Sequence, residues 1–119
     1  MTNSTPPIVP VASTAELARW LLRRRTRFAV VGPSMEPTLR AGQVVLVDER
    51  TAPELGDVAV VLHPRRSGLK IVKRLADRSP DGGWVLASDN ATEPNSEDSR
   101  TFGPVGADAI VGRVTSVIR

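Results

Sequence analysis

The chain has 119 residues, a length that provides for one hydrophobic core but not two. It contains no cysteine and a single histidine, His63, which excludes disulfides and thiolate chemistry and leaves a zinc site almost without ligands. The formal net charge is +3, from 16 basic and 13 acidic residues, a modest excess of base that is uneven along the chain. We expect no cofactor.

The N-terminal residues predict an extended arm followed by a short helix. Residues 1–12 are polar and contain three prolines, which interrupt regular structure and indicate a flexible arm. Ser13 or Thr14 can cap a helix over residues 15–25. Leucines and Trp20 give this helix an apolar side, which could dock against the domain or lie on a membrane.

Five arginines lie between positions 19 and 27. The commoner interpretation is a solvated helix end, where arginine suits the negative pole of the helix dipole. Nucleic acid and an anionic membrane surface are the alternatives. We expect no nucleic-acid partner, because no RNA-binding or helix-turn-helix pattern accompanies the cluster. Weak peripheral membrane contact through residues 14–27 stays open.

The sequence predicts a cytoplasmic location. No apolar stretch approaches the about 20 residues that a bilayer-spanning helix needs. The N-terminus also lacks the charged and apolar regions of a secretory signal peptide, so nothing in the sequence indicates export.

From position 28 onward the pattern is one of short apolar runs bounded by turn residues. The runs are rich in β-branched residues, and no helical pattern separates them, which indicates an all-β barrel or sandwich. The stretch 90–103 is rich in proline and acidic residues, and we expect a long ordered loop of the kind that often carries function. The predicted strands cover 28–31, 43–47, 57–62, 69–75, 84–87 and 109–118.

A serine between rigid residues is the first candidate for chemistry. Ser34 lies in the run Gly32-Pro-Ser-Met-Glu-Pro37, in which a glycine and two prolines fix the backbone. Such a turn can present a hydroxyl and aim backbone N–H groups at one point, as an oxyanion hole requires. From this segment alone, a turn in which the serine bonds only its own backbone is an equally good interpretation. His63 stands beside a proline and two arginines, where a Ser-His-Asp relay is hard to build.

A lysine can replace histidine as the base if burial frees its amine. In the strand predicted over 69–75, Lys73 falls on the face of Ile71 and Leu75, whereas Lys70 falls on the other face. A lysine on a buried face is costly unless it is neutral or paired, so Lys73 is the candidate base. The alternative is a lysine at a strand end whose amine reaches water.

The stretch 88–103 contributes a third set of polar residues. Ser96 could hold the lysine amine in line with the serine hydroxyl. Asp98 can pair with Arg100 and can also reach Arg74, which would brace the loop beneath the site. An ordinary solvated acidic turn is the alternative, because Asp, Asn and Ser are common in loops.

These segments together resemble the signal peptidase I family (S26) of serine-lysine proteases. The resemblance runs from about position 31 to position 113. The sequence motifs of the family, called boxes, occur in the family's order with none missing, which is more specific than a lone Ser-Met pair. The matching segments are Ser34–Leu39 as the nucleophile box, Leu55–Val58 as a strand box, Lys73-Arg74 as the lysine box, and Ser88–Asn90 with Ser96–Arg100, Gly103 and Ile110–Arg113 as the last box.

The resemblance implies a mostly β, compact signal-peptidase-like or LexA-like catalytic core with one short N-terminal helix. By this division the arm covers 1–12, the helix and basic turn 13–27, and the catalytic domain 28–119. It implies that Ser34 is the nucleophile and Lys73 the general base. The remaining residues it assigns are Ser96, Asp98, Arg100 and Arg74 as support, Gly32 beside an oxyanion hole formed by the Ser34 N–H, and Met35, Pro37, Asp89 and Asn90 in substrate binding.

Departures from the family pattern shape the expected substrate. Ser88 replaces a usual glycine, the loop over 90–96 is slightly longer, and only a short turn separates Arg74 from Trp84, where large bacterial signal peptidases insert a second β region. With no anchor expected, the chain resembles the maturation proteases of nickel-type superoxide dismutase. The partner implied is a precursor with an N-terminal leader and small residues, often alanine, at the first and third positions before the cut.

Two other functions remain open at this point. One is an ordinary signal peptidase that processes exported proteins at the membrane, with the N-terminal helix lying on the bilayer. The other is a self-cleaving LexA-like regulator or peptide-binding module on the same serine-lysine fold.

Overall fold

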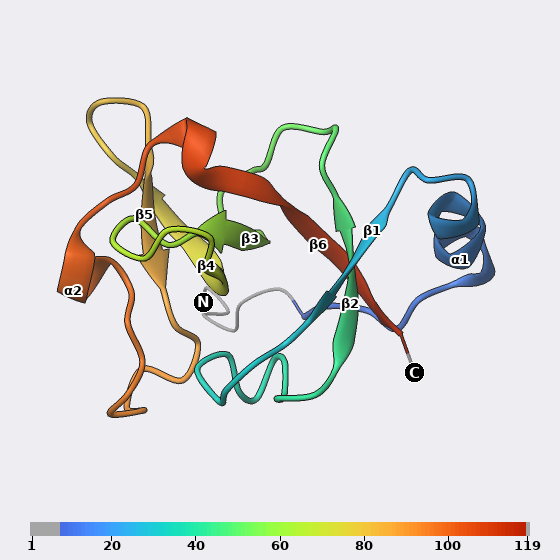
Figure 1. The fold of residues 1–119 in the computed structure, drawn as a ribbon, viewed down its shortest axis with the longest axis horizontal. Coiled ribbons are helices and arrows are strands. Elements are labelled where there is room, and N and C mark those ends of the chain that lie inside the picture. The colour runs from blue at the N-terminus through green and yellow to red at the C-terminus, as the bar shows by residue number, and fades with distance from the viewer. Residues whose placement is uncertain (1–7, 119) are drawn as a thin grey trace, which may run out of the picture.

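Six valine-rich segments form a single antiparallel sheet in the computed structural model, which describes residues 8–118. Each apolar run becomes a strand because β-branched residues suit a pleated, half-buried surface. The strand order is β1-β2-β6-β3-β4-β5 (Figure 1). The elements are α1 (Thr14–Leu21), β1 (Thr26–Ala29), β2 (Val44–Asp48), β3 (Val58–Leu62), β4 (Lys70–Arg78), β5 (Trp84–Ala87), α2 (Ser99–Phe102), the 3-10 turn η1 (Ala107–Ala109) and β6 (Ile110–Ile118).

The predicted fold class, mostly β with one short N-terminal helix, is confirmed. Each of the six predicted strands is present, and most strand ends move by one or two residues. The largest difference is in β4, which continues past Leu75 to Arg78. The sequence pattern hides this extension because the last three residues of β4 are polar or small and exposed.

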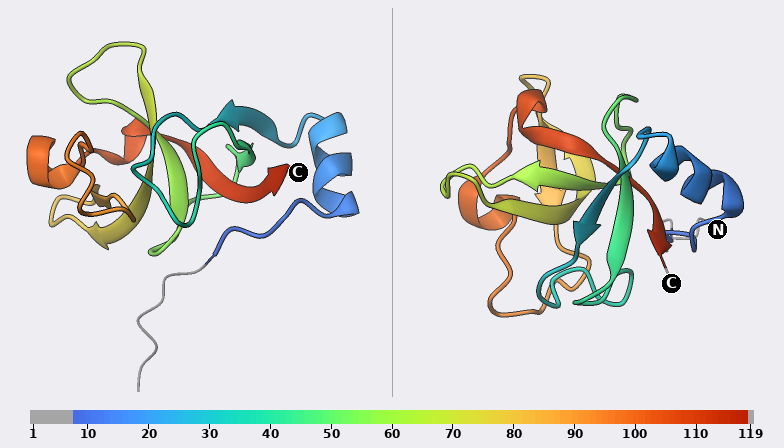
Figure 2. Two further views of the ribbon diagram at one scale, coloured as in Figure 1. Left: turned by 90° about the horizontal axis from the view of Figure 1, so that it is seen from below. Right: turned by 45° about the vertical axis from the view of Figure 1, so that its right-hand side comes forward.

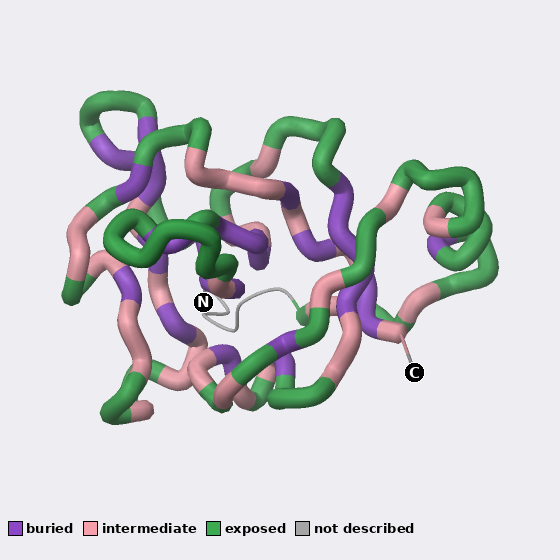
Figure 3. The backbone as a smooth tube through the Cα atoms, in the orientation of Figure 1, coloured by how far each residue is buried: buried purple, intermediate pink, exposed green. Residues whose placement is uncertain are grey.

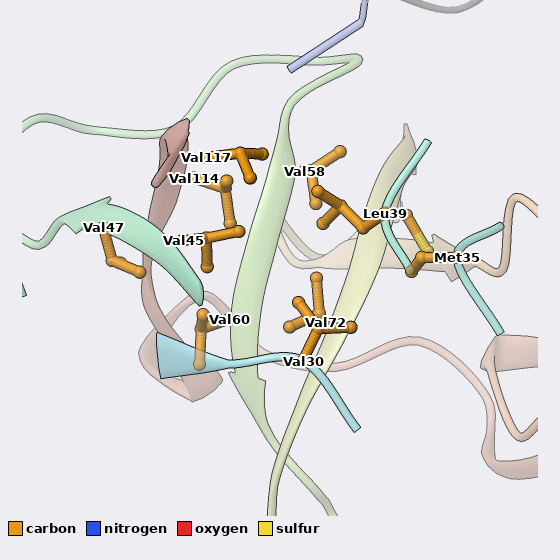
Figure 4. Close-up of a cluster of buried hydrophobic side chains, with 10 residues drawn as sticks. All are labelled: Val30, Met35, Leu39, Val45, Val47, Val58, Val60, Val72, Val114 and Val117. Carbon is orange, nitrogen blue, oxygen red and sulfur yellow. The ribbon is translucent and has the colours of Figure 1, made fainter. Parts of the chain in front are cut away.

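Apolar side chains cover both faces of the sheet, which explains why its central strands are apolar at successive positions. Successive residues of these strands are buried (Figure 3). Along β3, Val58 and Val60 join one cluster, whereas Ala59 and Val61 join the other. The larger cluster, drawn in Figure 4, contains Val30, Met35, Leu39, Val45, Val47, Val58, Val60, Val72, Val114 and Val117. The smaller cluster contains Ala59, Val61, Leu75, Trp84, Leu86 and Val105.

Helix α1 docks on the sheet through a buried acid. Ser13 accepts a hydrogen bond from the Glu16 N–H at 3.2 Å and caps the helix. The Glu16 carboxylate accepts hydrogen bonds from the hydroxyls of Thr115 and Ser116 on β6, and from Arg25 at 3.0 Å. This polar contact fixes α1 at the end of the sheet opposite β5 (Figure 1).

The leucines at the end of α1 are exposed, so the helix docks on the sheet through its buried acid and not through its apolar side. Leu17, Leu21 and Leu22 are 37%, 78% and 70% exposed. The helix also ends at Leu21 rather than at the predicted position 25, because Arg23 adopts a left-handed backbone with φ of 61°. The buried acid, not the apolar side, determines which face of this helix meets the sheet.

The residues before α1 pair with the last strand. The Val117 N–H donates to the Pro10 carbonyl, and the Ala12 N–H donates to the Val117 carbonyl, both at 2.8 Å. Val9 packs against the larger apolar cluster. The arm predicted over 1–12 is therefore held to β6 at its C-terminal end, and its first seven positions lie outside the described residues.

Two loops, which follow the two edge strands β1 and β5, meet and place the candidate site between them. The loop between β1 and β2 lies beside the loop between β5 and α2 (Figure 2). The Asn90 N–H donates to the Ser34 carbonyl at 2.8 Å, and the Asn90 amide donates to the Pro33 carbonyl at 3.0 Å. The stretch 90–103, predicted as a loop, ends in the short helix α2, which Asp98 caps.

Replacement of Glu16 by alanine should destabilise the fold by about 1–3 kcal/mol, because the buried Ser116 hydroxyl loses its acceptor and Arg25 loses its nearest carboxylate. Urea unfolding followed by circular dichroism measures the change. The matched control is Glu49→Ala, which removes an exposed acid bonded to Thr26 and should cost less than about 0.5 kcal/mol. Equal unfolding midpoints for the two variants would contradict the docking role of Glu16.

The stabilisation by Glu16 should also depend on pH. Burial alone would raise the pKa of Glu16, but the hydrogen bonds from Thr115, Ser116 and Arg19 and the charge of Arg25 outweigh it and hold the pKa below its usual 4.5. A lowered pKa in the folded state means that the contribution is complete above the unfolded value and is lost as pH falls through the folded value. The stabilities of the wild type and Glu16→Ala should therefore converge in acid.

Candidate active site

The loop that carries Ser34 is anchored in the core from behind. Gly32, two residues earlier, has a φ of +78°, a left-handed conformation that favours glycine. Met35 and Leu39, 1% and 0% exposed, pack into the larger apolar cluster (Figure 4). The Leu39 N–H donates to the Met35 carbonyl at 3.0 Å, which closes one turn behind the serine. Ser34 itself lines a surface cavity.

The amine of Lys73 is buried beside the Ser34 hydroxyl. Lys73 is 4% exposed, and its Nζ lies 2.9 Å from Ser34 Oγ, within hydrogen-bond distance. On β4, Lys73 lies on the same face as Ile71 and Leu75. Leu75 belongs to the smaller apolar cluster and Ile71 packs against it, whereas Lys70 is exposed. The alternation expected from the sequence is thus present in β4, and it brings Lys73, not Lys70, to the serine.

Burial lowers the pKa of Lys73 below its usual 10.5, because removal from water disfavours the charged amine. The charges of Asp98 and, to a smaller extent, Glu97 oppose part of this effect. Asp98 is 2% exposed and accepts hydrogen bonds from the Ser88 N–H at 2.9 Å and from Arg100 Nε at 3.1 Å. Burial alone would raise the pKa of Asp98, but these hydrogen bonds outweigh it and keep the pKa below 3.8. The Asp98–Arg100 pair expected from the sequence is therefore present.

Arg74, the neighbour of Lys73 on β4, binds Asp89 in a bidentate pair. Arg74 Nε and Nη2 lie 3.1 Å and 2.6 Å from the two carboxylate oxygens, and Thr38 of the serine loop donates to the same carboxylate. The sequence indicates that Asp98 can also reach Arg74, which stays a prediction, but it does not indicate the pair with Asp89. Arg74 is paired with Ala87 on β5, and position 89 lies two residues further on, diagonally across the strands.

Ser96 reaches the site but contacts another hydroxyl. It lines the same cavity as Ser34 and Lys73, and its Oγ is hydrogen-bonded to Oγ of Ser88, which is 6% exposed. Among the hydrogen bonds of residues 8–118, the Lys73 amine has Ser34 as its partner. The role of Ser96 in orienting the lysine stays a prediction, and Ser88 joins the site as a residue that the sequence marks only as a departure from glycine.

His63 also lines the cavity, but its ring is engaged elsewhere. Nδ1 accepts a hydrogen bond from the Arg65 N–H at 3.1 Å, so the neutral ring carries its proton on Nε2, which lies 3.3 Å from the Glu97 carboxylate. Phe102 contacts the ring edge-on, with 5.2 Å between ring centroids. Because both nitrogens have partners, the geometry does not offer His63 as a base for Ser34.

The cavity is a groove of about 310 Å³ with an apolar wall and a charged rim. Phe28 and Val31 contribute from the β1 side, and Leu69 and Ile71 from the β4 side. The groove therefore lies between two strands, in a position where an extended peptide could run past Ser34. The charged or titratable residues around it are His63, Arg66, Lys70, Lys73, Glu93 and Glu97.

The four residues predicted to contact substrate have other roles, and none of them lines this cavity. Met35 is buried in the core, and Asp89 is occupied by Arg74. The Asn90 amide donates a hydrogen bond to the Pro33 carbonyl in the serine loop, and Pro37 is exposed in the same loop. The role of these four residues in substrate binding stays a prediction.

Two site residues escape sequence reasoning, Thr38 and Glu97. Thr38 follows the serine by four residues, the spacing of one helical turn, which could have placed it on the inner side of the loop. No pattern marks Glu97, because an acidic residue in a polar loop is ordinary. Residues 8–118 contain no group of three or more His, Cys, Asp or Glu side chains arranged to hold a metal ion. None of the helices in this part of the chain has the length and apolarity to cross a bilayer.

Comparison with known proteins agrees with this geometry. A family model described as Peptidase S24-like matches residues 18–115. The mitochondrial inner membrane protease subunit 1 of Xenopus tropicalis is 32% identical over 106 residues. That match covers 70% of this chain and 62% of the relative, so the chain spans about three fifths of the length of the protein it resembles. Because the family match extends over most of the chain, including Ser34 and Lys73, the protein belongs to the Peptidase S24-like family.

Proposed function

We propose that the protein is a serine endopeptidase in which Ser34 is the nucleophile and Lys73 is the general base. The observation that carries the proposal is the buried amine 2.9 Å from the serine hydroxyl. Membership of a peptidase family supports the reaction class, and the engaged ring of His63 leaves Lys73 as the base.

The chemistry follows from the protonation state of the amine. Neutral Lys73 accepts the proton of Ser34 Oγ as the oxygen attacks the peptide carbonyl. The resulting ammonium then gives the proton to the leaving amine as the C–N bond breaks, which leaves an acyl-enzyme. The lysine next takes a proton from water, whose oxygen attacks the ester, and returns it to Ser34 as the acid product leaves. In this scheme the Ser34 N–H, beside Gly32, contributes to the oxyanion hole.

The substrate that we propose is a protein precursor from which a short N-terminal leader is removed. The groove between β1 and β4 suits an extended peptide, and its apolar wall suits small apolar side chains near the cut. The specific precursor that we propose is that of nickel-type superoxide dismutase. We propose that the protease cleaves it in the cytoplasm. The short connection between β4 and β5, which resembles the minimal members of the signal peptidase group, supports this choice.

Co-expression with a nickel superoxide dismutase precursor tests the substrate. We expect a product whose new N-terminus, read by protein sequencing, follows a residue with a small side chain. An uncut precursor beside wild-type enzyme that cleaves other small-residue peptides would remove this substrate and leave the reaction class intact.

A membrane-associated processing peptidase is the second candidate. The exposed Leu17, Leu21 and Leu22 favour it, since they lie beside the arginines of the basic turn. The name of the Xenopus relative also places that protein at a membrane. Fractionation separates the two proposals: a protein found wholly in washed membranes supports the second candidate and contradicts the cytoplasmic one.

Replacement of Ser34 or Lys73 by alanine should lower peptide cleavage by about 10³-fold or more, because each removes a group that the scheme cannot replace. Cleavage of a fluorogenic peptide with alanine at the first and third positions before the cut measures the rate. Lys70→Ala is the matched control, because this exposed lysine lies on the same strand and at the rim of the groove but not at the serine, and it should retain kcat, with any loss confined to KM. Full activity in Lys73→Ala would remove the general-base assignment.

Activity should rise with pH through the pKa of Lys73, because only the neutral amine accepts the serine proton. Burial lowers this pKa, so the midpoint should lie below 10.5. The profile of kcat/KM against pH measures it. A rate that does not change from weakly acidic to alkaline pH would be inconsistent with an amine base.

Arg74→Lys should lower kcat by about tenfold or more and destabilise the fold by about 1–3 kcal/mol, because a lysine cannot bind Asp89 in a bidentate pair. Peptide cleavage and urea unfolding measure the two effects. Arg78→Lys, at an exposed position of the same strand, should leave cleavage unchanged and cost less than about 1 kcal/mol of stability, from a weaker contact with the Trp84 ring. A fully active Arg74→Lys variant would show that this pair does not set the distance between Ser34 and Lys73.

A further inference from the structure

Glu97 is a charged group at the active site that the proposed reaction does not use. It lines the same cavity as Ser34 and Lys73, and it stands between Ser96, whose hydroxyl reaches this cavity, and the buried Asp98. Unlike Asp98, it caps no helix and accepts no backbone hydrogen bond among the contacts recorded for residues 8–118.

Two basic side chains on the opposite wall hold the Glu97 carboxylate at the rim. His63 Nε2 and Arg66 Nη2 both lie 3.3 Å from the same oxygen of Glu97. The His63 side chain is 2% exposed and fixed by the Arg65 N–H, so it offers a rigid contact, whereas the Arg66 side chain is 64% exposed. The carboxylate is therefore placed by a buried ring and only partly neutralised by an arginine in water.

We propose that Glu97 is a positioning residue that acts on the Lys73 amine across the cavity through its charge, with His63 and Arg66 fixing the carboxylate. The inference rests on the proposed role of Lys73 as the base. The titratable or charged groups that face these two residues are His63, Arg66, Lys70, Glu93 and Asp98.

The direction of the effect follows from the sign of the charges. A carboxylate favours the protonated amine, so Glu97 opposes the lowering of the Lys73 pKa by burial. The consequence is that the neutral Lys73 amine is a stronger base, but a smaller fraction of it is neutral at a given pH. Arg66 acts in the opposite direction, because it partly neutralises the Glu97 carboxylate.

The composition of the chain allows a direct test without a substrate. Lys70 and Lys73 are its two lysines, so selective ¹³C labelling of lysine gives two Cε signals, which the Lys70→Arg variant assigns. Titration of these signals by NMR follows Lys73 directly, and exposed Lys70 serves as an internal reference.

In Glu97→Gln, the Lys73 titration should move to lower pH by about half a unit, which is about a threefold larger neutral fraction at fixed pH below the midpoint. The matched control is Glu93→Gln, which removes an acid on the same cavity that does not contribute to the pKa shift of Lys73, and it should leave the titration in place. Arg66→Gln should move the titration in the opposite direction, to higher pH. The acidic limb of the cleavage profile should move with the signal in each variant.

An unchanged Lys73 titration in Glu97→Gln would overturn the proposal, as would an equal shift in Glu93→Gln, which would indicate total charge rather than placement. If Glu97→Gln does not fold, the Arg66→Gln variant decides instead. A Lys73 titration that does not move to higher pH in Arg66→Gln would then overturn the proposal. A failure of the proposed peptidase function gives a different result from a failure of the Glu97 proposal. If the peptidase function is wrong, the NMR titration moves as expected, but neither the wild type nor any variant cleaves the peptide.

Discussion

The bidentate pair between Arg74 and Asp89 is the interaction on which the rest of the site depends. It joins β4, which carries the adjacent lysine, to the segment after β5, and through Thr38 it reaches the loop that carries Ser34. Both partners are largely buried, so the pair is screened little by water. Because three segments distant in sequence converge on one carboxylate, the distance between the hydroxyl and the amine is set by the sheet and not by a mobile loop.

Much of the fold could be predicted because its physical cause is local. Alternating β-branched residues and glycine turns predict the strands, and the same alternation separates Lys73 from Lys70. Since β4 is buried at its centre on both faces, the one lysine within the apolar row had to be neutral or paired. The serine loop could also be anticipated, because a glycine and prolines leave it few conformations. These features depend on neighbours along the chain.

The features that could not be predicted depend on contacts across the sheet. The register of β4 with β5 brings Asp89 to Arg74, and a sequence does not display register. Helix α1 shows the same limit more strongly. Its leucines indicate a docking face, yet the hydroxyls of β6 offer Glu16 better partners, so the helix turns its acid inward. In α1, the buried hydrogen bonds of the acid to the sheet, and not the apolar periodicity of the helix, determine which face meets the sheet.

The same pairing logic explains how a buried lysine can serve as a base. An amine near an unpaired carboxylate forms an ion pair, which raises its pKa and keeps it charged. Here three acids near the lysine each pair with a guanidinium. The three pairs are Arg74 with Asp89, Arg100 with Asp98 and Arg66 with Glu97. Because these partners weaken the effect of the acids, burial is the largest influence on Lys73 and lowers its pKa. The Arg66 pair is the most exposed of the three, so its charges can change with the least disturbance of the fold.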